Sequence, residues 1–295
     1  MSADGILVVD KPEGMTSRAV TNRISRLLRE KKAGHLGTLD PIARGALPVA
    51  LGKATRLVRF LERDDKLYRA VIRLGRATDT LDREGKTTGE GEWKHLSPDE
   101  ITAAALGFRG QLLQTPPMHS ALKKNGVPLY QLARKGIETE REPRAVTVFE
   151  LEVEKLEPPE ITIRVLCSPG TYLRVIAHDL GQKLGSCAHL ADLTRLRSGP
   201  FSLEQAVKLD ELEEETARQN MIPLEKCLPR FPALELSPDQ AEMIRDGVAL
   251  AADQLPEPVA PDLYYRLTRK GALLAVARAT NREGRLIIKP ERVFA

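Results

Sequence analysis

Aromatic residues and cysteines are scarce in this chain of 295 residues. Phe, Trp and Tyr make up 4% of it, and the only cysteines are Cys167, Cys187 and Cys227. An odd number of widely spaced cysteines in a chain of this length favours reduced thiols over a disulfide framework. Because aromatic side chains are so few, those that lie beside polar motifs are candidates for a binding site.

Long apolar runs are also missing. No uninterrupted apolar stretch approaches the roughly 18 residues that a membrane helix needs, and the N-terminal sequence MSADGILVVDKPEG has no basic region followed by an apolar one. We therefore expect a cytoplasmic protein that has no contact with a membrane. The apolar share of 42% is enough to fill real cores, and a chain of this length has room for about two domains of ordinary size.

Net charge is small overall but unevenly distributed. The chain carries +4, whereas residues 1–76 hold 16 Lys and Arg against 8 Asp and Glu. A basic segment on an otherwise balanced chain is typical of a protein that meets phosphates. Runs of charge also mark ordinary solvated faces, so charge alone leaves both interpretations open.

Periodicity predicts both strands and helices in the first half of the chain. Residues 5–9 form an apolar run typical of a buried strand, and a helix with Ser17 as its N-cap should follow. Residues 67–74 alternate in polarity, which puts Tyr68 on the inward face of a strand. Ser97 opens a capping box that predicts a further helix.

The second half is expected to be richer in strands. Residues 110–126 contain paired prolines and no periodicity, so we expect a long loop there. Residues 145–156 and 161–167 are predicted strands joined by a hairpin turn. Beyond residue 230, short apolar runs alternate with glycines, which indicates a small β-rich second domain.

Two familiar site types are excluded by their spacing. Gly52 and Lys53 look like the end of a phosphate-binding loop, but Leu47 stands where that loop needs a glycine, and Ala54 replaces the required hydroxyl. The five histidines lack the tight paired spacing of a zinc site. We therefore expect neither a nucleoside triphosphatase nor a metal site.

A polar loop at residues 34–41, GHLGTLDP, gathers two glycines, a histidine, a hydroxyl and a carboxylate. Gly34 and Gly37 permit positive φ and the close approach of a ligand. Asp40 is therefore a candidate catalytic residue. An aspartate before proline also often does no more than bind local amides in a turn, and the residues alone do not decide between the two.

Several blocks of sequence, in order along the chain, carry a family resemblance. They are DKPEGMTS at 10–17, GHLGTLDPIARGALP at 34–48, KLYRAVIRLGRATDTLD at 66–82, CSPGTYLRVIAHDLGQKLG at 167–185 and LTRLRSGPF at 193–201. Together they resemble the TruB-type tRNA pseudouridine synthases, which isomerise uridine 55 in the T loop of tRNA. The segment at 114–137 is similar to the family's insertion, and the tail ending GRLIIKPERVF is similar to a PUA domain.

The resemblance implies an α+β fold, the pseudouridine synthase fold, with a mixed, largely antiparallel central sheet flanked by helices and a small C-terminal β-barrel that is PUA-like. Residues 1–230 would form the catalytic domain, with an RNA-binding insertion at about 110–137, and residues 231–295 the PUA-like RNA-binding domain. The implied partner is tRNA, held through its T arm and elbow by a monomer that needs no cofactor and no obligatory protein partner.

The resemblance also implies three catalytic residues. Asp40 matches the nucleophile, and a carboxylate can attack either ribose C1′ or uracil C6. Arg174 matches the arginine that holds and aims that carboxylate. Tyr68 matches the active-site tyrosine, which either stacks on the extruded uracil or takes part in proton transfer.

Five further residues are implied in substrate binding. Tyr172 and Leu193 would line the uracil pocket, and Asp82 matches a polar position of the family motif. His35 would fill the space that the everted nucleotide leaves, and Lys11 would contact a phosphate.

One departure and three alternatives remain. His119 stands where the insertion commonly has a tyrosine, so contacts assigned to that tyrosine are in doubt. The alternatives are an RNA-guided pseudouridine synthase for ribosomal RNA, a non-catalytic protein that folds or binds tRNA, and a glycosidase-like hydrolase, which would need two cooperating carboxyl groups. The long insertion favours the stand-alone tRNA enzyme.

Overall fold

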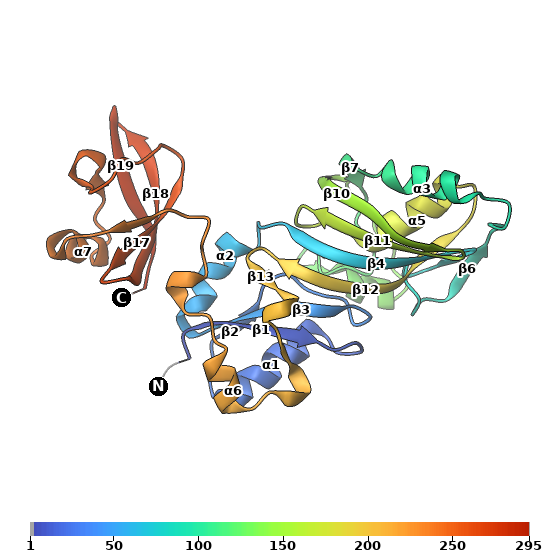
Figure 1. The fold of residues 1–295 in the computed structure, drawn as a ribbon, viewed down its shortest axis with the longest axis horizontal. Coiled ribbons are helices and arrows are strands. Elements are labelled where there is room, and N and C mark those ends of the chain that lie inside the picture. The colour runs from blue at the N-terminus through green and yellow to red at the C-terminus, as the bar shows by residue number, and fades with distance from the viewer. Residues whose placement is uncertain (1–2, 295) are drawn as a thin grey trace.

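The computed structural model describes residues 3–294, and most of it is built on a ten-stranded sheet (Figure 1). In chain order its strands are β1 (Gly5–Lys11), β2 (Ala33–His35), β3 (Arg44–Leu51), β4 (Lys66–Leu74), β7 (Gly110–Gln114), β10 (Arg144–Glu157), β11 (Glu160–Cys167), β12 (Ala188–Ser198), β13 (Phe201–Ser202) and β14 (Val207–Lys208). The strand order is β14-β1-β3-β12-β4-β11-β10-β7, with β13 beside β12 and β2 beside β3. Of these pairs, β1–β14 and β3–β12 are parallel and the others antiparallel. The predicted mixed, largely antiparallel sheet is confirmed.

Helices flank this sheet, as expected for an α+β fold. They are α1 (Ser17–Leu27), α2 (Val58–Leu61), α3 (Pro98–Leu106), α4 (Leu129–Arg134), α5 (Leu173–Lys183) and α6 (Glu214–Gln219), and α7 (Pro238–Arg245) belongs to the C-terminal unit. Helices α3 and α5 cover one face of β4, β10 and β11 (Figure 1), where Ile101 and Ile176 share a core with Ile72 and Ile163. Burial of these apolar side chains is the main force that holds the helices on the sheet.

Alternation along β4 places its residues as predicted. Ala70, Ile72 and Leu74 are buried, whereas Arg69 and Arg73 are exposed on the opposite face. The capping box at Ser97 and the hairpin between β10 and β11 are also confirmed.

The first of two wrong local predictions is the N-cap of α1. Thr16, not Ser17, caps this helix, because the Thr16 hydroxyl accepts from the Ala19 amide at 3.1 Å. Ser17 is turned inward, where its hydroxyl donates to the Leu39 carbonyl at 3.0 Å and accepts from the Leu39 amide at 2.8 Å. The serine therefore ties α1 to the loop that carries Asp40.

The predicted loop at residues 110–126 is in part regular structure. It begins with edge strand β7, which pairs with β10, and its end contributes to the small hairpin of β8 (Lys123–Lys124) and β9 (Val127–Pro128). The prolines that suggested a loop come only after β7 has ended. Another two-stranded sheet is formed by β5 (Arg76–Thr78) and β6 (Thr87–Glu90).

Residues after 230 form the small β-rich unit that was predicted. Its strands are β15 (Ala233–Glu235), β16 (Leu250–Ala251), β17 (Tyr264–Arg269), β18 (Ala272–Arg282) and β19 (Arg285–Val293), in the order β15-β17-β18-β19-β16. Helix α7 packs beside β18 and β19 (Figure 1).

An aromatic cluster joins the two units. Phe60 of α2 packs against Phe231 and Tyr264, with ring centroids 5.3 to 6.1 Å apart within the cluster. Lys53 donates to the Phe294 carbonyl and Arg56 to the Val293 carbonyl, each at 2.9 Å. The C-terminal sheet is therefore held against the larger N-terminal unit by both apolar packing and hydrogen bonds.

We expect Gly45→Ala to lower the free energy of unfolding by about 2 kcal/mol or more. Gly45 has a φ of 102°, and a Cβ added there would lie 2.4 Å from the carbonyl oxygen of Arg195. Gly126→Ala is the matched control, since its φ is 81° but nothing lies within 4 Å of the added Cβ, so only the backbone cost of about 1 kcal/mol applies. Equal urea midpoints for the two variants would contradict this close contact between β3 and β12.

Candidate active site

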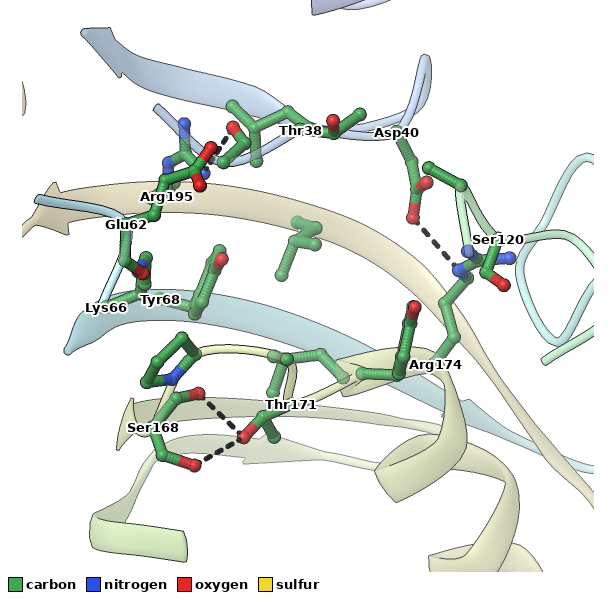
Figure 2. Close-up of a pocket in the computed structure, with 18 of the residues that line it drawn as sticks. Thr38, Asp40, Glu62, Lys66, Tyr68, Ser120, Ser168, Thr171, Arg174 and Arg195 are labelled. Atoms are coloured by element: carbon green, nitrogen blue, oxygen red, sulfur yellow. Dashed lines mark hydrogen bonds and ion pairs between the residues drawn. The ribbon is translucent and has the colours of Figure 1, made fainter. Parts of the chain in front are cut away.

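A cavity of about 450 Å³ opens on the covered side of β4 and β12 (Figure 2). Its walls come from the loop after β2, the strands β4 and β12, the 120–122 segment of the insertion and the turn that leads into α5. Five of the predicted site residues line it, namely Asp40, Tyr68, Tyr172, Arg174 and Leu193. Segments far apart in the sequence thus meet at one hollow.

Asp40 and Arg174 form an ion pair at one end of the cavity (Figure 2). The Nε of Arg174 lies 3.0 Å from Oδ2 of Asp40. Arg174 is 3% exposed, whereas the Asp40 side chain keeps 35% of its surface open. The carboxylate is therefore oriented by a buried cation yet remains accessible from the cavity.

The rest of the Arg174 guanidinium is bonded to two other segments. Its Nη1 donates to the Thr80 carbonyl at 3.0 Å, and its Nη2 donates to the His119 carbonyl at 2.8 Å. Because His119 contributes its backbone, this contact does not depend on the side chain at that position. A planar guanidinium holds these donors in a fixed fork, whereas the donors of a lysine rotate about a single nitrogen.

Asp82 lies behind Arg174 and is not among the residues that line the cavity. Its Oδ2 is 3.6 Å from Nη1 of Arg174, and its Oδ1 accepts from the Thr80 hydroxyl at 2.6 Å. Asp82 is buried. The structure therefore places this carboxylate beside the arginine. Asp82 was predicted to bind substrate, but it does not line the cavity.

Burial raises the pKa of Asp40 above its ordinary value, and the negative charge of Asp82 acts in the same direction. The Arg174 guanidinium opposes both effects. Arg174 therefore limits the rise in the pKa of Asp40 without cancelling it.

Tyr68 lies on β4 directly opposite Arg195 of β12. Burial raises the pKa of the Tyr68 phenol, and the Arg195 guanidinium only partly offsets this. The phenol is consequently neutral at neutral pH. Tyr172 is the N-cap residue of α5, and its backbone amide donates to Oε1 of Gln114 at 3.0 Å.

Arg195 is a functional residue that the sequence analysis missed. It is almost completely buried, and it donates to the carbonyls of Ala46 at 2.8 Å, Gly37 at 3.1 Å and Leu36 at 3.4 Å. The loop that carries Asp40 is thereby fixed to β12. The period-two spacing from Leu193, already a candidate, was the signal that places Arg195 on the same strand face.

Lys11 does not fit its predicted contact with phosphate. It is fully buried, and its ammonium donates to the carbonyls of Ala43 at 2.6 Å, Pro12 at 2.8 Å and Pro41 at 3.4 Å. Burial lowers the pKa of Lys11 to about 8. Lys11 therefore braces the chain that follows Asp40, because β1 points its side chain into that loop.

His35 is half-buried and lies outside the cavity lining. Its Nδ1 is 3.2 Å from the Thr21 hydroxyl, and its Nε2 is 3.3 Å from the Thr38 hydroxyl. Burial lowers the pKa of the imidazole, so the ring is neutral near neutral pH. Its place next to Thr38 puts it beside the cavity wall.

Within residues 3–294, the side chains of His, Cys, Asp and Glu form no group of three or more that could hold a metal ion. None of the helices described there is long and apolar enough to cross a membrane.

Comparison with known families decides the relationship. The family model of the TruB family pseudouridylate synthase N-terminal domain matches residues 25–173, and that of the tRNA pseudouridylate synthase B C-terminal domain matches residues 174–231. The chain belongs to the TruB family of pseudouridylate synthases. The resemblance inferred from the sequence blocks is thus confirmed.

Members of the TruB family resemble this chain over nearly its whole length. The tRNA pseudouridine synthase B of Geobacter sulfurreducens is 44% identical over 93% of each chain. That of Syntrophotalea carbinolica is 45% identical over 87% of this chain and 85% of its own. A solved chain of a Cbf5-Nop10-Gar1 complex is 28% identical, with a TM-score of 0.78 over 99% of this chain and 85% of that one. The pseudouridine synthase fold of this TruB family member is therefore confirmed.

We expect Arg174→Gln to raise the pKa of Asp40, because the substitution removes the cation that holds this value down. A carbon-13 NMR titration of the Asp40 carboxyl measures the pKa directly, whether or not the variant is active. Arg218→Gln removes the same charge from an exposed pair with Glu214 on α6 and should leave the Asp40 titration unchanged. An unshifted Asp40 in Arg174→Gln would contradict the proposed electrostatic coupling.

Proposed function

We propose that this TruB family chain isomerises uridine 55 in the T loop of tRNA to pseudouridine, with Asp40 as the attacking carboxylate. The observation that carries the proposal is the Asp40–Arg174 ion pair, which presents a partly open carboxylate to a cavity of nucleoside size. The relatives named tRNA pseudouridine synthase B indicate tRNA as the substrate.

The chemistry needs one nucleophile and no electron donor or acceptor. The bond between ribose C1′ and uracil N1 breaks, the base turns, C5 bonds to C1′, the proton on C5 is lost and N1 gains a proton. Asp40 forms a transient covalent bond, at either C1′ or C6, and this bond breaks again to free the carboxylate and the product. The base must first leave its stack to reach the cavity, and the neutral imidazole of His35 fills the space that it vacates.

Tyr68 and Leu193 form the surfaces on which the uracil rests, with Tyr172 beside them. The raised pKa of Tyr68 keeps its phenol protonated, which favours stacking over removal of a proton. A ring on the cavity floor offsets part of the unstacking cost, since base–aromatic stacking contributes about 1–3 kcal/mol.

The cavity carboxylates argue against the hydrolase alternative. Among the residues that line it, Asp40 and Glu62 are the carboxylic acids, and they lie at opposite ends (Figure 2). A hydrolase that breaks the same bond needs two carboxyl groups flanking it. Asp82 is paired with Arg174 and does not line the cavity.

The two-domain assignment belongs to the same proposal. Residues 1–230 form the catalytic domain, the insertion at about 110–137 contacts the RNA, and residues 231–295 act as a PUA-like RNA-binding domain on the tRNA. The five-stranded C-terminal sheet supports this assignment. We propose a stand-alone cytoplasmic monomer, because relatives named for tRNA match it along nearly their whole length, whereas the Cbf5 neighbour is seen in a complex with Nop10 and Gar1.

Asp40→Asn should lower the rate of conversion by about 10³-fold or more while tRNA binding is kept, because one carboxylate supplies the chemistry and many basic contacts supply the affinity. Release of tritium from C5-labelled uridine in a tRNA transcript measures conversion, and filter binding measures affinity. Asp210→Asn, at an exposed aspartate paired with Arg23, is the matched control.

Each alternative function predicts a different result in this experiment. An Asp40→Asn variant that converts uridine at the unchanged rate would refute Asp40 as the nucleophile. Free uracil in the wild-type reaction would identify a hydrolase. Binding without any conversion by the wild-type protein would identify a tRNA-binding or folding protein.

A further inference from the structure

The cavity has a second charged end, to which the proposed function gives no role. Lys66, Glu62 and Arg195 lie there, across the cavity from the Asp40–Arg174 pair (Figure 2). Lys66 precedes Tyr68 by two residues on β4, so both side chains belong to the same strand face. Lys66 is only 6% exposed. A buried lysine that lines a substrate cavity is costly to desolvate and therefore calls for an explanation.

The ammonium group of Lys66 is anchored by backbone oxygens. Its Nζ donates to the Glu62 carbonyl at 2.6 Å and also to the Asp64 carbonyl. An ammonium carries three donors and no acceptor. Hydrogen bonds within residues 3–294 thus use two of its three N–H groups, which leaves one for a ligand in the cavity.

The turn that holds Lys66 is itself fixed from the C-terminal side. Nη1 of Arg230 lies 2.5 Å from Oδ1 of Asp64, and its Nη2 donates to the Phe60 carbonyl at 2.7 Å. The Gly199 amide donates to the Asp65 carbonyl at 2.9 Å. The turn whose carbonyls bind the Lys66 ammonium is therefore itself braced, as a specificity contact requires.

The surroundings of Lys66 bring its pKa close to neutral pH. Burial, followed by the Arg195 guanidinium, lowers the pKa of Lys66 to about 8, whereas the carboxylates of Asp64 and Asp65 raise it. The Cys167 thiol on the neighbouring strand is neutral, since burial raises its pKa to about 12. Lys66 is thus mostly protonated at neutral pH and loses its proton slightly above.

Uracil offers what such a group can bind. Its two exocyclic oxygens are acceptors, whereas cytosine carries an amino group, a donor, at position 4. We propose that Lys66 is a specificity-determining residue of the reaction proposed above, on which this inference rests: its ammonium donates to the O4 carbonyl oxygen of the extruded uracil and so selects uracil over cytosine, which has an amino group there. Asp40 lies at the reacting side of the base, and Lys66 contacts the opposite edge of the base.

Lys66→Met tests this contact, because it keeps the length of the side chain and removes the donor. With a tRNA transcript carrying U55 under single-turnover conditions, we expect kcat/KM to fall about 10- to 100-fold. A transcript with cytidine at position 55, used as a competitive inhibitor, should bind this variant nearly as well as the U55 transcript. Lys66→Arg retains a cationic donor and should recover most of the discrimination.

Two comparisons separate recognition from mere support of the fold. Lys155→Met changes an exposed lysine paired with Glu157 and should behave as the wild type. A loss in Lys66→Met that is equal for the U55 and C55 transcripts would overturn the inference, because a structural defect weakens both alike.

The pH profile gives a second test, which also serves if Lys66→Met fails to fold. Activity of the wild type should decline above about pH 8, as Lys66 loses its proton. Asp64→Asn removes a charge that raises this pKa, so the alkaline limb should move to lower pH. In Lys66→Arg the decline should shrink to the part that Lys11 contributes, since the pKa of Lys11 is also about 8, and a profile unchanged in that variant would overturn the inference.

The outcome for Asp40 keeps the two proposals distinct. If Asp40→Asn is inactive and Lys66→Met shows wild-type rate and discrimination, the inference about Lys66 fails alone. If the wild type converts no uridine, the proposed function fails.

Discussion

The site depends on one buried guanidinium group, that of Arg174. Arg174 is buried at the start of α5 and bonds the Asp40 carboxylate, the Thr80 carbonyl and the His119 carbonyl. These partners come from three separate segments, so the position of the carboxylate is set by the whole fold. A carboxylate held in this way is oriented before any ligand arrives, so no further ordering of its side chain is needed on binding.

Buried cations that bind backbone carbonyls recur around the cavity. Lys11 braces the chain after Asp40, Arg195 holds the loop before it, and Lys66 is held by the turn before β4. Carbonyl oxygens satisfy the N–H groups without neutralising the positive charge. The cavity wall therefore combines rigidity with an electropositive character, which suits an anionic polynucleotide.

The sequence allowed prediction of the residues that meet at the cavity better than of what each one contacts. Asp40, Tyr68 and Arg174 meet at the cavity, because their motifs fix both residue type and strand or helix position, whereas their catalytic roles stay a prediction. Lys11 was misassigned, since a lysine beside a loop looks the same whether it faces a phosphate or three carbonyls. Arg195 was missed because its partners lie about 150 residues away. Pairing at a distance also explains why the edge strand at residues 110–114 was taken for a loop.

The packing of Phe60 against Phe231 and Tyr264 has a consequence for the shape of the substrate. Since these rings pack in one continuous core, they hold the C-terminal sheet in a set position relative to the ten-stranded sheet. The distance from Asp40 to the C-terminal sheet is then set as well. An RNA that contacts both must have a matching length and bend, so the rigid packing between the two units excludes helices of another geometry.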